Sequence, residues 1–251
     1  MKLCRFLFAD DERPRTGIFH DNQIYETDGE RALGVHQPND IRLLAPVAPS
    51  TLRMFDAFAP REGVPQFTFE NSSAIVGPEV DITFPEDSEK RDFQMQIAAV
   101  AGKTESDLEV EEAEDYILGF TILNCWTARD AGRQGTAKAT DFAISVGPFL
   151  VTPEELEDKA SGSRYNLAMK ALVNGEVVSS ANLSSMAHSF AELFAEAGRG
   201  ASVREGDIIA SGSAPGGSLM QLERDYLQPG DDVTFVVERL GTLTNRVAFA
   251  T

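Results

Sequence analysis

The stretch Gly119-Phe120-Thr121-Ile122-Leu123-Asn124-Cys125-Trp126-Thr127-Ala128-Arg129-Asp130 stands near the middle of a chain of 251 residues. Its first half continues an apolar run that starts at Ile117, and such a run predicts a strand over residues 117–124. Beyond this strand the sequence turns polar and ends in an arginine and an aspartate. The stretch therefore predicts a buried strand whose end carries side chains capable of chemistry.

Strand-like segments recur on both sides of this stretch. The predicted strands cover residues 67–69, 74–76, 93–102, 142–150, 165–173, 176–180, 208–211 and 232–240. Turn-forming residues separate several of them, because Asn174-Gly175 predicts a tight hairpin and Pro229-Gly230-Asp231 predicts a turn. Near the N-terminus, Asp21-Asn22 predicts a hairpin between short strands.

Helical signals are few. The predicted helices cover residues 50–58, 105–113, 152–157 and 185–197. Many strands and few helices predict an α+β, β-rich fold with a mixed, barrel-like sheet. We expect a small N-terminal β region and connector over residues 1–65, followed by a larger domain over residues 66–251.

The charge balance excludes several functional classes. The chain has 40 acidic and 22 basic residues, for a formal net charge of −18. Nucleic-acid binders depend on Lys and Arg contacts to phosphates, so we expect no nucleic-acid partner. No apolar stretch approaches the roughly 20 residues that span a bilayer, so we expect no membrane partner. The acidic excess fits a soluble, highly charged surface or a high-salt habitat.

Two cysteines, Cys4 and Cys125, are too few for a disulfide framework, so we expect a reducing, cytoplasmic location. The sequence contains no P-loop, no HExxH and no CxxC motif. Cys125 is open to two interpretations. It is either a small buried apolar residue or a thiolate near Arg129.

A series of short motifs runs in order along the chain. They are Ala74-Ile75-Val76-Gly77-Pro78, residues 93–103, 119–130 and 141–148, Val173-Asn174-Gly175-Glu176, and residues 206–212, 227–231 and 239–247. In this order they resemble the fumarylacetoacetate hydrolase family over about three quarters of the chain. The first ~45 residues also resemble the small N-terminal β region common in this family.

The resemblance implies a mixed β-roll with few helices, and usually a homodimer. It also implies a chemistry. Members bind Mg²⁺ or Ca²⁺ through acidic side chains and hydrolyse, decarboxylate, hydrate or tautomerise small 2-keto or 1,3-diketo acids. A His–Glu pair activates water, and a lysine helps to polarise the substrate carbonyl.

This sequence departs from the family pattern at the positions of the metal ligands. Glutamine stands at Gln94 and Gln96, where the family has glutamates, and Cys125 replaces an aspartate. In a looser alignment, a further aspartate corresponds to Met54. Mg²⁺ and Ca²⁺ prefer anionic oxygen ligands, so we expect no metal and no cofactor at this site.

The catalytic positions depart as well. The family histidine falls on Arg61, its partner glutamate on Gln221, and the lysine on Thr140, with Lys138 two residues away. The Gly-Thr of the substrate loop is kept in kind as Gly212-Ser213. The sequence therefore keeps the packing motifs of the family pattern, whereas the acidic side chains expected at the site are replaced.

Three functions remain open. The first is a metal-free isomerase, cyclase or lyase acting on a dicarbonyl or polyketide-like small molecule through neutral hydrogen-bonding groups, in a biosynthetic role. The second is a non-catalytic pseudoenzyme or ligand-binding subunit. The third is residual hydrolase or decarboxylase activity on 2-keto or 1,3-diketo acids. The candidate catalytic residues are Cys125, Gln94, Gln96, Thr140 and Lys138, and the candidate substrate-binding residues are Gln221, Ser213, Gly212, Arg61, Met54 and Arg129.

Overall fold

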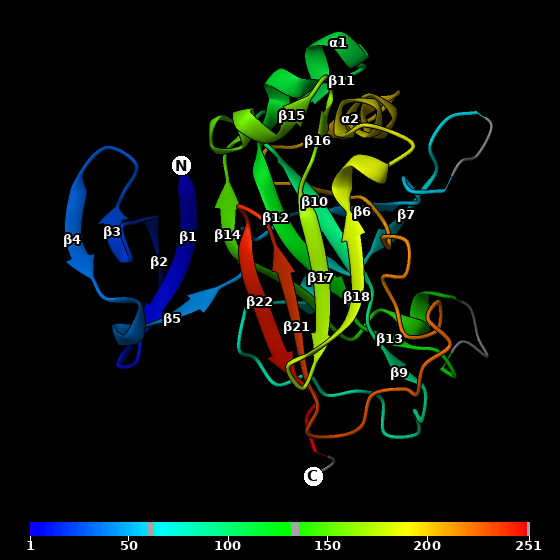
Figure 1. Ribbon diagram of the computed structural model, residues 1–251. Helices are drawn as coiled ribbons and strands as arrows, with labels where there is room; N and C mark the ends of the chain where they lie inside the picture. The colour runs from blue at the N-terminus through cyan, green and yellow to red at the C-terminus, as the bar shows by residue number, and fades with distance from the viewer. Residues whose placement is uncertain (60–62, 132–135, 250–251) are drawn as a thin grey trace.

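A large mixed sheet organises the chain. The computed structural model describes residues 1–59, 63–131 and 136–249. Within them the main sheet has the order β4-β3-β2-β1-β14-β12-β10-β20-β6-β7, with β5 paired to β1 and β8 paired to β14 (Figure 1). The fold is β-rich with a mixed sheet, which confirms the α+β class expected from the sequence.

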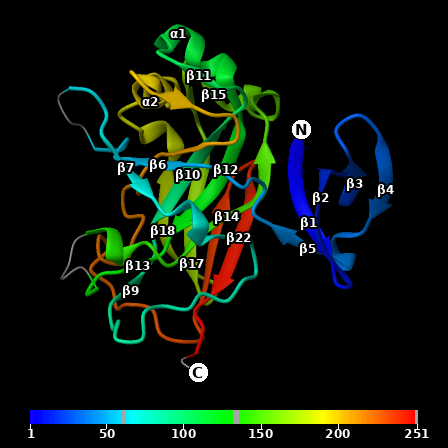
Figure 2. The same cartoon turned by 180° about the vertical axis from the view of Figure 1, so that it is seen from behind.

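The N-terminal strands form a lobe to one side of the main body, as both views show (Figures 1 and 2). The lobe contains β1 (Lys2–Phe8), β2 (Asp11–His20), β3 (Gln23–Thr27), β4 (Ala32–His36) and β5 (Ile41–Leu44). Asp21 and Asn22 adopt φ of 48° and 58°, the left-handed geometry that closes a tight hairpin between β2 and β3. Strand β1 joins the lobe to the body by pairing with β14.

The centre of the sheet is almost entirely buried. The strands of this part of the sheet are β6 (Leu52–Phe55), β7 (Phe67–Glu70), β8 (Ile75–Val76), β10 (Met95–Ala101), β12 (Ile117–Cys125), β14 (Ile144–Val151) and β20 (Ile208–Ala210), of which β7 and β8 are partly exposed. Every residue of β10 is buried, and so is all of β12 except Leu118. This burial explains why these segments are apolar runs rather than alternating patterns.

A second sheet covers one face of the first. It has the order β18-β17-β21-β22 and contains β17 (Ala168–Val173), β18 (Glu176–Asn182), β21 (Asp232–Val237) and β22 (Gly241–Arg246). Phe93, beside the main sheet, packs against Phe235 of β21 with ring centroids 5.4 Å apart. The main hydrophobic core therefore lies between the two sheets.

Short strand pairs and helices close the ends of this body. The pairs are β9 (Arg91–Asp92) with β13 (Thr127–Ala128), β11 (Glu105–Ser106) with β19 (Ser202–Val203), and β15 (Ala160–Ser161) with β16 (Arg164–Tyr165). The α-helices are α1 (Val110–Ala113) and α2 (Phe190–Gly198), and 3-10 turns span Pro38–Asp40, Ser72–Ala74, Glu114–Tyr116, Thr136–Ala139, Pro153–Lys159 and Leu183–Ser185.

Helix α2 begins with a capping box, in which the Ser189 hydroxyl accepts from the Glu192 N–H and the Glu192 carboxylate accepts from the Ser189 N–H.

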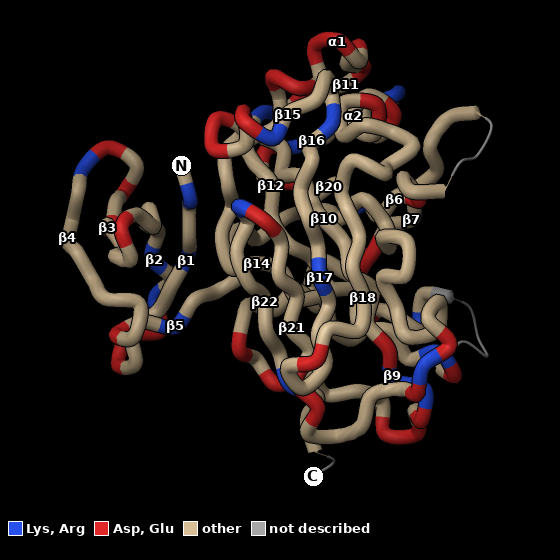
Figure 3. The backbone as a smooth tube through the Cα atoms, in the orientation of Figure 1, with Lys and Arg blue, Asp and Glu red and all other residues tan. Residues whose placement is uncertain are grey.

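Acidic residues gather around α1 and at the loops of the opposite end, and the strands between them carry little charge (Figure 3). Within the described residues no helix is long and apolar enough to cross a bilayer.

Several sequence predictions need correction. The helix predicted over residues 50–58 is wrong, because this segment forms strand β6, which pairs in parallel with β20 and antiparallel with β7. Tertiary pairing that buries Leu52 and Phe55 overrides the local helical signal there. The helix predicted over residues 105–113 is reduced to α1. The strand predicted over residues 232–240 ends at Val237, and β22 follows it.

Phe120 is a direct test of the core. Its fully buried ring contacts the rings of Tyr165 and Phe190, at centroid distances of 4.9 and 5.3 Å. We expect Phe120→Ala to lower the free energy of unfolding by about 3–5 kcal/mol in a denaturant titration. Leu118→Ala, at the exposed residue near the start of the same strand, is the control and should cost about 1 kcal/mol or less. Equal losses would contradict this placement of the core.

Candidate active site

A cavity opens where β6, β7 and the segment after β20 meet the start of β10. Its volume is about 430 Å³. Its lining consists of Met54, Phe55, Asp56, Gln66, Phe67, Thr68, Gln94, Gly212, Ser213 and Gln221. The sheet brings these residues together because β20 pairs with β6 on one side and with β10 on the other. Five of the predicted site residues therefore share one cavity: Met54, Gln94, Gly212, Ser213 and Gln221.

Backbone contacts form the back wall of the cavity. Gly212 has a φ of +78°, and a Cβ at this position would collide with the carbonyl oxygen of Phe55. Next to it, the Ala57 N–H donates to the Ser211 carbonyl at 2.9 Å. Only glycine fits at Gly212, because the end of β6 lies directly against the loop that follows β20.

Neutral side chains in the lining keep hydrogen-bonding capacity. The Gln94 amide nitrogen donates to the Thr127 hydroxyl at 2.8 Å, and its oxygen accepts no bond from the described residues. Conversely, the Gln221 oxygen accepts from the Gly217 N–H at 3.0 Å, and its amide nitrogen donates to no group in the described part of the chain. Among residues 1–59, 63–131 and 136–249, the Ser213 hydroxyl has a single long contact of 3.5 Å, to the Ala214 carbonyl. The cavity thus offers an amide, a hydroxyl and an amide oxygen to a ligand.

Gln96 lies behind the lining rather than in it. Its side chain is fully buried. Its amide oxygen accepts from the Gly212 N–H at 3.1 Å, and its amide nitrogen lies 3.3 Å from the Met54 sulfur. Gln96 therefore ties β10 to the loop and to β6, and its polar atoms are occupied within the protein.

The structure also buries Cys125 completely and places it outside the cavity lining. Burial raises the pKa of its thiol far above the usual range, and the nearby Glu70 carboxylate adds to this effect. The thiol stays protonated at neutral pH, which fits the packing interpretation of this residue.

The predicted lysine, threonine and arginine lie elsewhere. The Thr140 hydroxyl donates to the Glu70 carboxylate at 2.9 Å. Lys138 pairs with Asp141 at 2.6 Å and lines a separate cavity of about 770 Å³. Arg129 pairs at 2.9 Å with the buried Asp92. Arg61 lies outside the described residues.

The donors at the family metal positions do not fit Mg²⁺ or Ca²⁺. Two neutral amides and a protonated thiol stand where the resemblance places carboxylates, and hard cations need anionic oxygen to offset dehydration. Within residues 1–59, 63–131 and 136–249 no group of three or more His, Cys, Asp or Glu side chains could hold a metal ion. We therefore derive no step through a metal.

Asp56, Gln66 and Thr68 also line the cavity, although the sequence did not single them out. Asp56 directly follows β6, and polar residues at strand ends are a usable signal. That signal was hidden because residues 50–58 were expected to be helical. The Thr68 hydroxyl donates to Glu70 at 3.0 Å, so it is already engaged.

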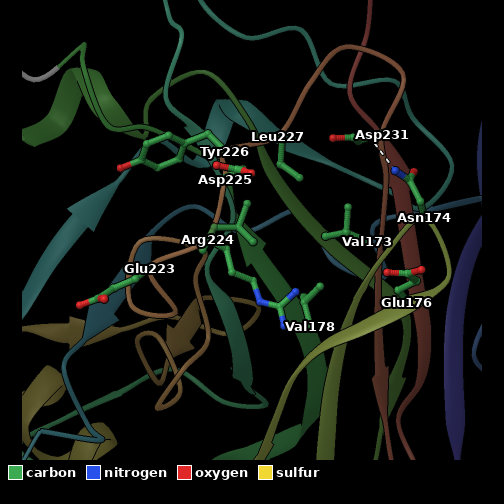
Figure 4. A pocket seen from close by; sticks show the side chains of 11 residues that line it. Val173, Asn174, Glu176, Val178, Glu223, Arg224, Asp225, Tyr226, Leu227 and Asp231 are labelled. Carbon is green, nitrogen blue, oxygen red and sulfur yellow. Dashed lines mark hydrogen bonds between the residues drawn. The ribbon is translucent and has the colours of Figure 1, made fainter.

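A larger cavity of about 650 Å³ lies beside β17 and β18, and none of the predicted site residues lines it. Figure 4 shows Arg224 extending toward Val178, and the hydrogen bond between Asn174 and Asp231 at the rim. Its charged residues are mostly acidic. Val173, Asn174, Glu176, Leu227 and Asp231 of its lining belong to the family motifs, but none of them stands at a position where the resemblance places a metal ligand or a catalytic residue. The cavity of about 430 Å³, lined by Gln94, Ser213 and Gln221, is therefore the candidate active site.

Comparison with known proteins agrees with this fold. Residues 50–248 match the family model described as fumarylacetoacetate (FAA) hydrolase C-terminal. The chain belongs to the fumarylacetoacetate hydrolase family. Residues 1–46 match a second model, described as Rv2993c-like, N-terminal. The boundary expected at residue 65 stays a prediction, and β6 of the connector pairs within the main sheet.

Relatives within the family carry several activities in their names. Oxaloacetate tautomerase FAHD2A, mitochondrial, from Bos taurus is 33% identical over 182 residues, which covers 70% of this chain and 56% of that protein. Protein Rv2993c from Mycobacterium tuberculosis is 31% identical, covering 83% of this chain and 79% of that protein. The chain spans little more than half the length of the first of these relatives.

A solved structure adds to this comparison. The 2-hydroxyhepta-2,4-diene-1,7-dioate isomerase from Mycobacterium marinum is 28% identical and superposes with a TM-score of 0.82. It covers 99% of this chain and 98% of that one. The similarity therefore extends over both the lobe and the main body.

Thiol reactivity tests the placement of Cys125. Both cysteines are buried, and burial also raises the pKa of Cys4 to about 12. We expect an aromatic disulfide reagent at pH 8 to modify the native protein about 100-fold more slowly than free cysteine, because reaction requires local opening. Both thiols should react at once in denaturant. Rapid labelling of Cys125 in the native protein, located by mass spectrometry, would contradict its burial and would again make it a candidate catalytic residue.

Proposed function

We propose that this chain is a metal-independent enzyme of the isomerase type that acts on a small dicarbonyl compound. The substrate binds in the cavity through Gln94, Gln221 and Ser213. The observation that supports this proposal is a cavity in which Met54 and Gln94, two of the positions where the resemblance places carboxylates, are neutral. The names of the oxaloacetate tautomerase and of the diene-dioate isomerase support the reaction class.

The available hydrogen-bond groups suit an enolate. The Gln221 amide and the Ser213 hydroxyl donate to a carbonyl oxygen, on which negative charge develops when a neighbouring carbon loses a proton. The Gln94 oxygen accepts from the enol hydroxyl once the proton has been returned to the carbonyl oxygen. Such donors stabilise the enolate relative to the ketone, which lowers the barrier to tautomerisation.

Asp56 supplies the proton transfer. It is the only carboxylic acid among the described residues that line the cavity. Its carboxylate removes the proton from the carbon between the carbonyl groups, and the electron pair moves to the carbonyl oxygen. Return of the proton to that oxygen gives the enol, so the atoms balance without a co-reactant.

The remaining predicted residues have supporting roles in this proposal. Gln96 and Arg129 hold the backbone in place through their buried bonds, and Cys125 fills the core. Thr140 and Lys138 engage carboxylates outside the cavity lining. The homodimer expected from the resemblance and the cytoplasmic location expected from composition stay predictions.

Removal of divalent metal ions distinguishes the proposed metal-independent reaction from the metal-dependent reactions that the resemblance implies. We expect the rate of ketonisation of an enolised 1,3-diketone, followed by ultraviolet absorbance, to be unchanged after dialysis against EDTA. Calorimetric titration with Mg²⁺ should show no micromolar binding, because no carboxylates stand at the family ligand positions. Loss of activity with EDTA and recovery with Mg²⁺ would instead support a residual hydrolase-type mechanism.

Removal of the carboxylate tests Asp56. We expect Asp56→Asn to lower kcat by about 10²–10⁴-fold with little change in KM, because general-base catalysis has this magnitude. Asp225→Asn removes an acidic side chain from the separate cavity beside β17 and β18, so it should leave kcat unaltered. Ligand binding without turnover in the unaltered protein would favour the non-catalytic binder.

A further inference from the structure

Asp92 is a fully buried carboxylate beside the candidate active site. It lies in β9, two residues before Gln94, and the described lining of the cavity does not include it. A buried carboxylate is tolerated only when charges and hydrogen bonds compensate for its loss of water. Its partners therefore indicate which parts of the structure it serves.

The Asp92 carboxylate joins two distant segments of the chain. One oxygen accepts from the N–H groups of Phe93 and Leu219, both at 2.8 Å, and the other accepts from the Met220 N–H at 3.3 Å. Leu219 and Met220 are 127 and 128 positions further along the chain and directly precede Gln221, the proposed donor to the substrate. Hydrogen bonds to a carboxylate are stronger than those between neutral groups, so Asp92 fixes the backbone immediately before this donor.

The pair of strands β9 and β13 connects Asp92 with Gln94. The Arg129 Nε donates to the second Asp92 oxygen at 2.9 Å and balances its charge. Thr127 of β13 lies opposite Asp92 in the strand register. The hydroxyl of the same threonine accepts from the Gln94 amide at 2.8 Å. Both glutamine side chains of the cavity are therefore held by elements that meet at Asp92.

The turn that carries Gln221 is held at both of its ends. The Gly217 carbonyl accepts from the Met95 N–H of β10 at 2.8 Å, which fixes the start of the turn. The Gln221 oxygen accepts from the Gly217 N–H at 3.0 Å, and the Gln221 backbone N–H donates to the Ser218 hydroxyl at 3.3 Å. The two N–H bonds to Asp92 lie between these contacts. Their loss would release the half of the turn that presents the Gln221 amide.

From these contacts we propose that Asp92 is a positioning residue of the candidate active site. It holds the turn so that the Gln221 amide points at the carbonyl oxygen on which charge develops, and it does not touch the substrate itself. This inference rests on the proposed isomerase function and adds a residue to it. Donors that are held in place before the reaction stabilise a developing charge better than mobile donors, because they need no reorganisation.

Asp92→Asn tests the positioning role. It keeps the shape of the side chain but replaces one acceptor oxygen by a donor, so one of the bonds to the turn is lost. We expect kcat for the ketonisation of enolised acetylacetone to fall about 10- to 100-fold, with less than about threefold change in KM, because misplacement of the donor affects the transition state most. An unchanged kcat would overturn the inference.

A double-mutant cycle with Gln221→Ala shows whether Asp92 acts through that amide. If it does, the double variant should be no slower than Gln221→Ala alone, within about twofold, because the donor to be positioned is already absent. Losses of kcat that multiply in the double variant would overturn the inference, since Asp92 would then act independently of Gln221.

Asp207→Asn is a matched control for general loosening of the fold. Asp207 is also buried, accepts from the N–H groups of Thr51 and Arg204 at 2.8 and 3.0 Å, and lies 3.4 Å from the Arg53 guanidinium. We expect a shift of the denaturant midpoint similar to that of Asp92→Asn. Any loss of kcat should multiply with that of Gln221→Ala. Equal coupling of the two aspartates to Gln221 would show loosening and not positioning.

Arg129→Lys is a milder variant that serves if Asp92→Asn does not fold. It keeps the positive charge beside Asp92 but removes the guanidinium that orients the carboxylate. We expect a loss of kcat of about three- to tenfold that disappears when Gln221→Ala is already present. A loss that persists in the double variant would overturn the inference.

Failure of the inference and failure of the proposed function are distinguishable. The unaltered protein tests the function, because it must convert acetylacetone. If it does and the losses multiply in the cycle, the function stands and the inference fails. If acetylacetone is bound without conversion, the isomerase function fails, and the same cycle measured on Kd by calorimetry decides whether Asp92 positions Gln221.

Discussion

The pairing of β20 with β6 on one edge and β10 on the other is the constraint on which the site depends. It brings together residues that are more than 150 positions apart in the chain, since Met54 lies opposite Ala210. Gly212 then allows the following loop to lie against the Phe55 carbonyl. The cavity is consequently shaped by strand pairing and by a close main-chain contact.

Hydrogen bonds satisfy the neutral side chains that stand where the resemblance places acidic ligands. A buried amide is tolerated when its polar atoms have partners, and Gln96 finds them in Gly212 and Met54. Gln94 is similarly held by Thr127, and the buried Cys125 thiol remains neutral. A cluster of unneutralised carboxylates in the same place would repel one another strongly without a cation. The neutral side chains present at these positions avoid that repulsion.

Much of the fold could be predicted from the sequence, because ordered motifs and buried apolar runs report long-range packing. The local sequence patterns that predict individual helices were less reliable. The segment containing Met54 was expected to be helical, and only its pairing with β7 and β20 reveals a strand, so Asp56 was missed. The residue types around the site were predicted better than their contacts. Thr140 and Arg129 are close to the motif positions in sequence, but their side chains engage Glu70 and Asp92 instead of the cavity.

The contact between Gly212 and Phe55 also bears on how this protein can change. Because main-chain atoms set the back wall, side chains such as Gln94, Ser213 and Gln221 can be exchanged without moving it. Binding preference and folding stability are then largely separate traits, and mutation can explore one with little penalty to the other. The chain is thus a receptive scaffold for directed evolution toward new ligands.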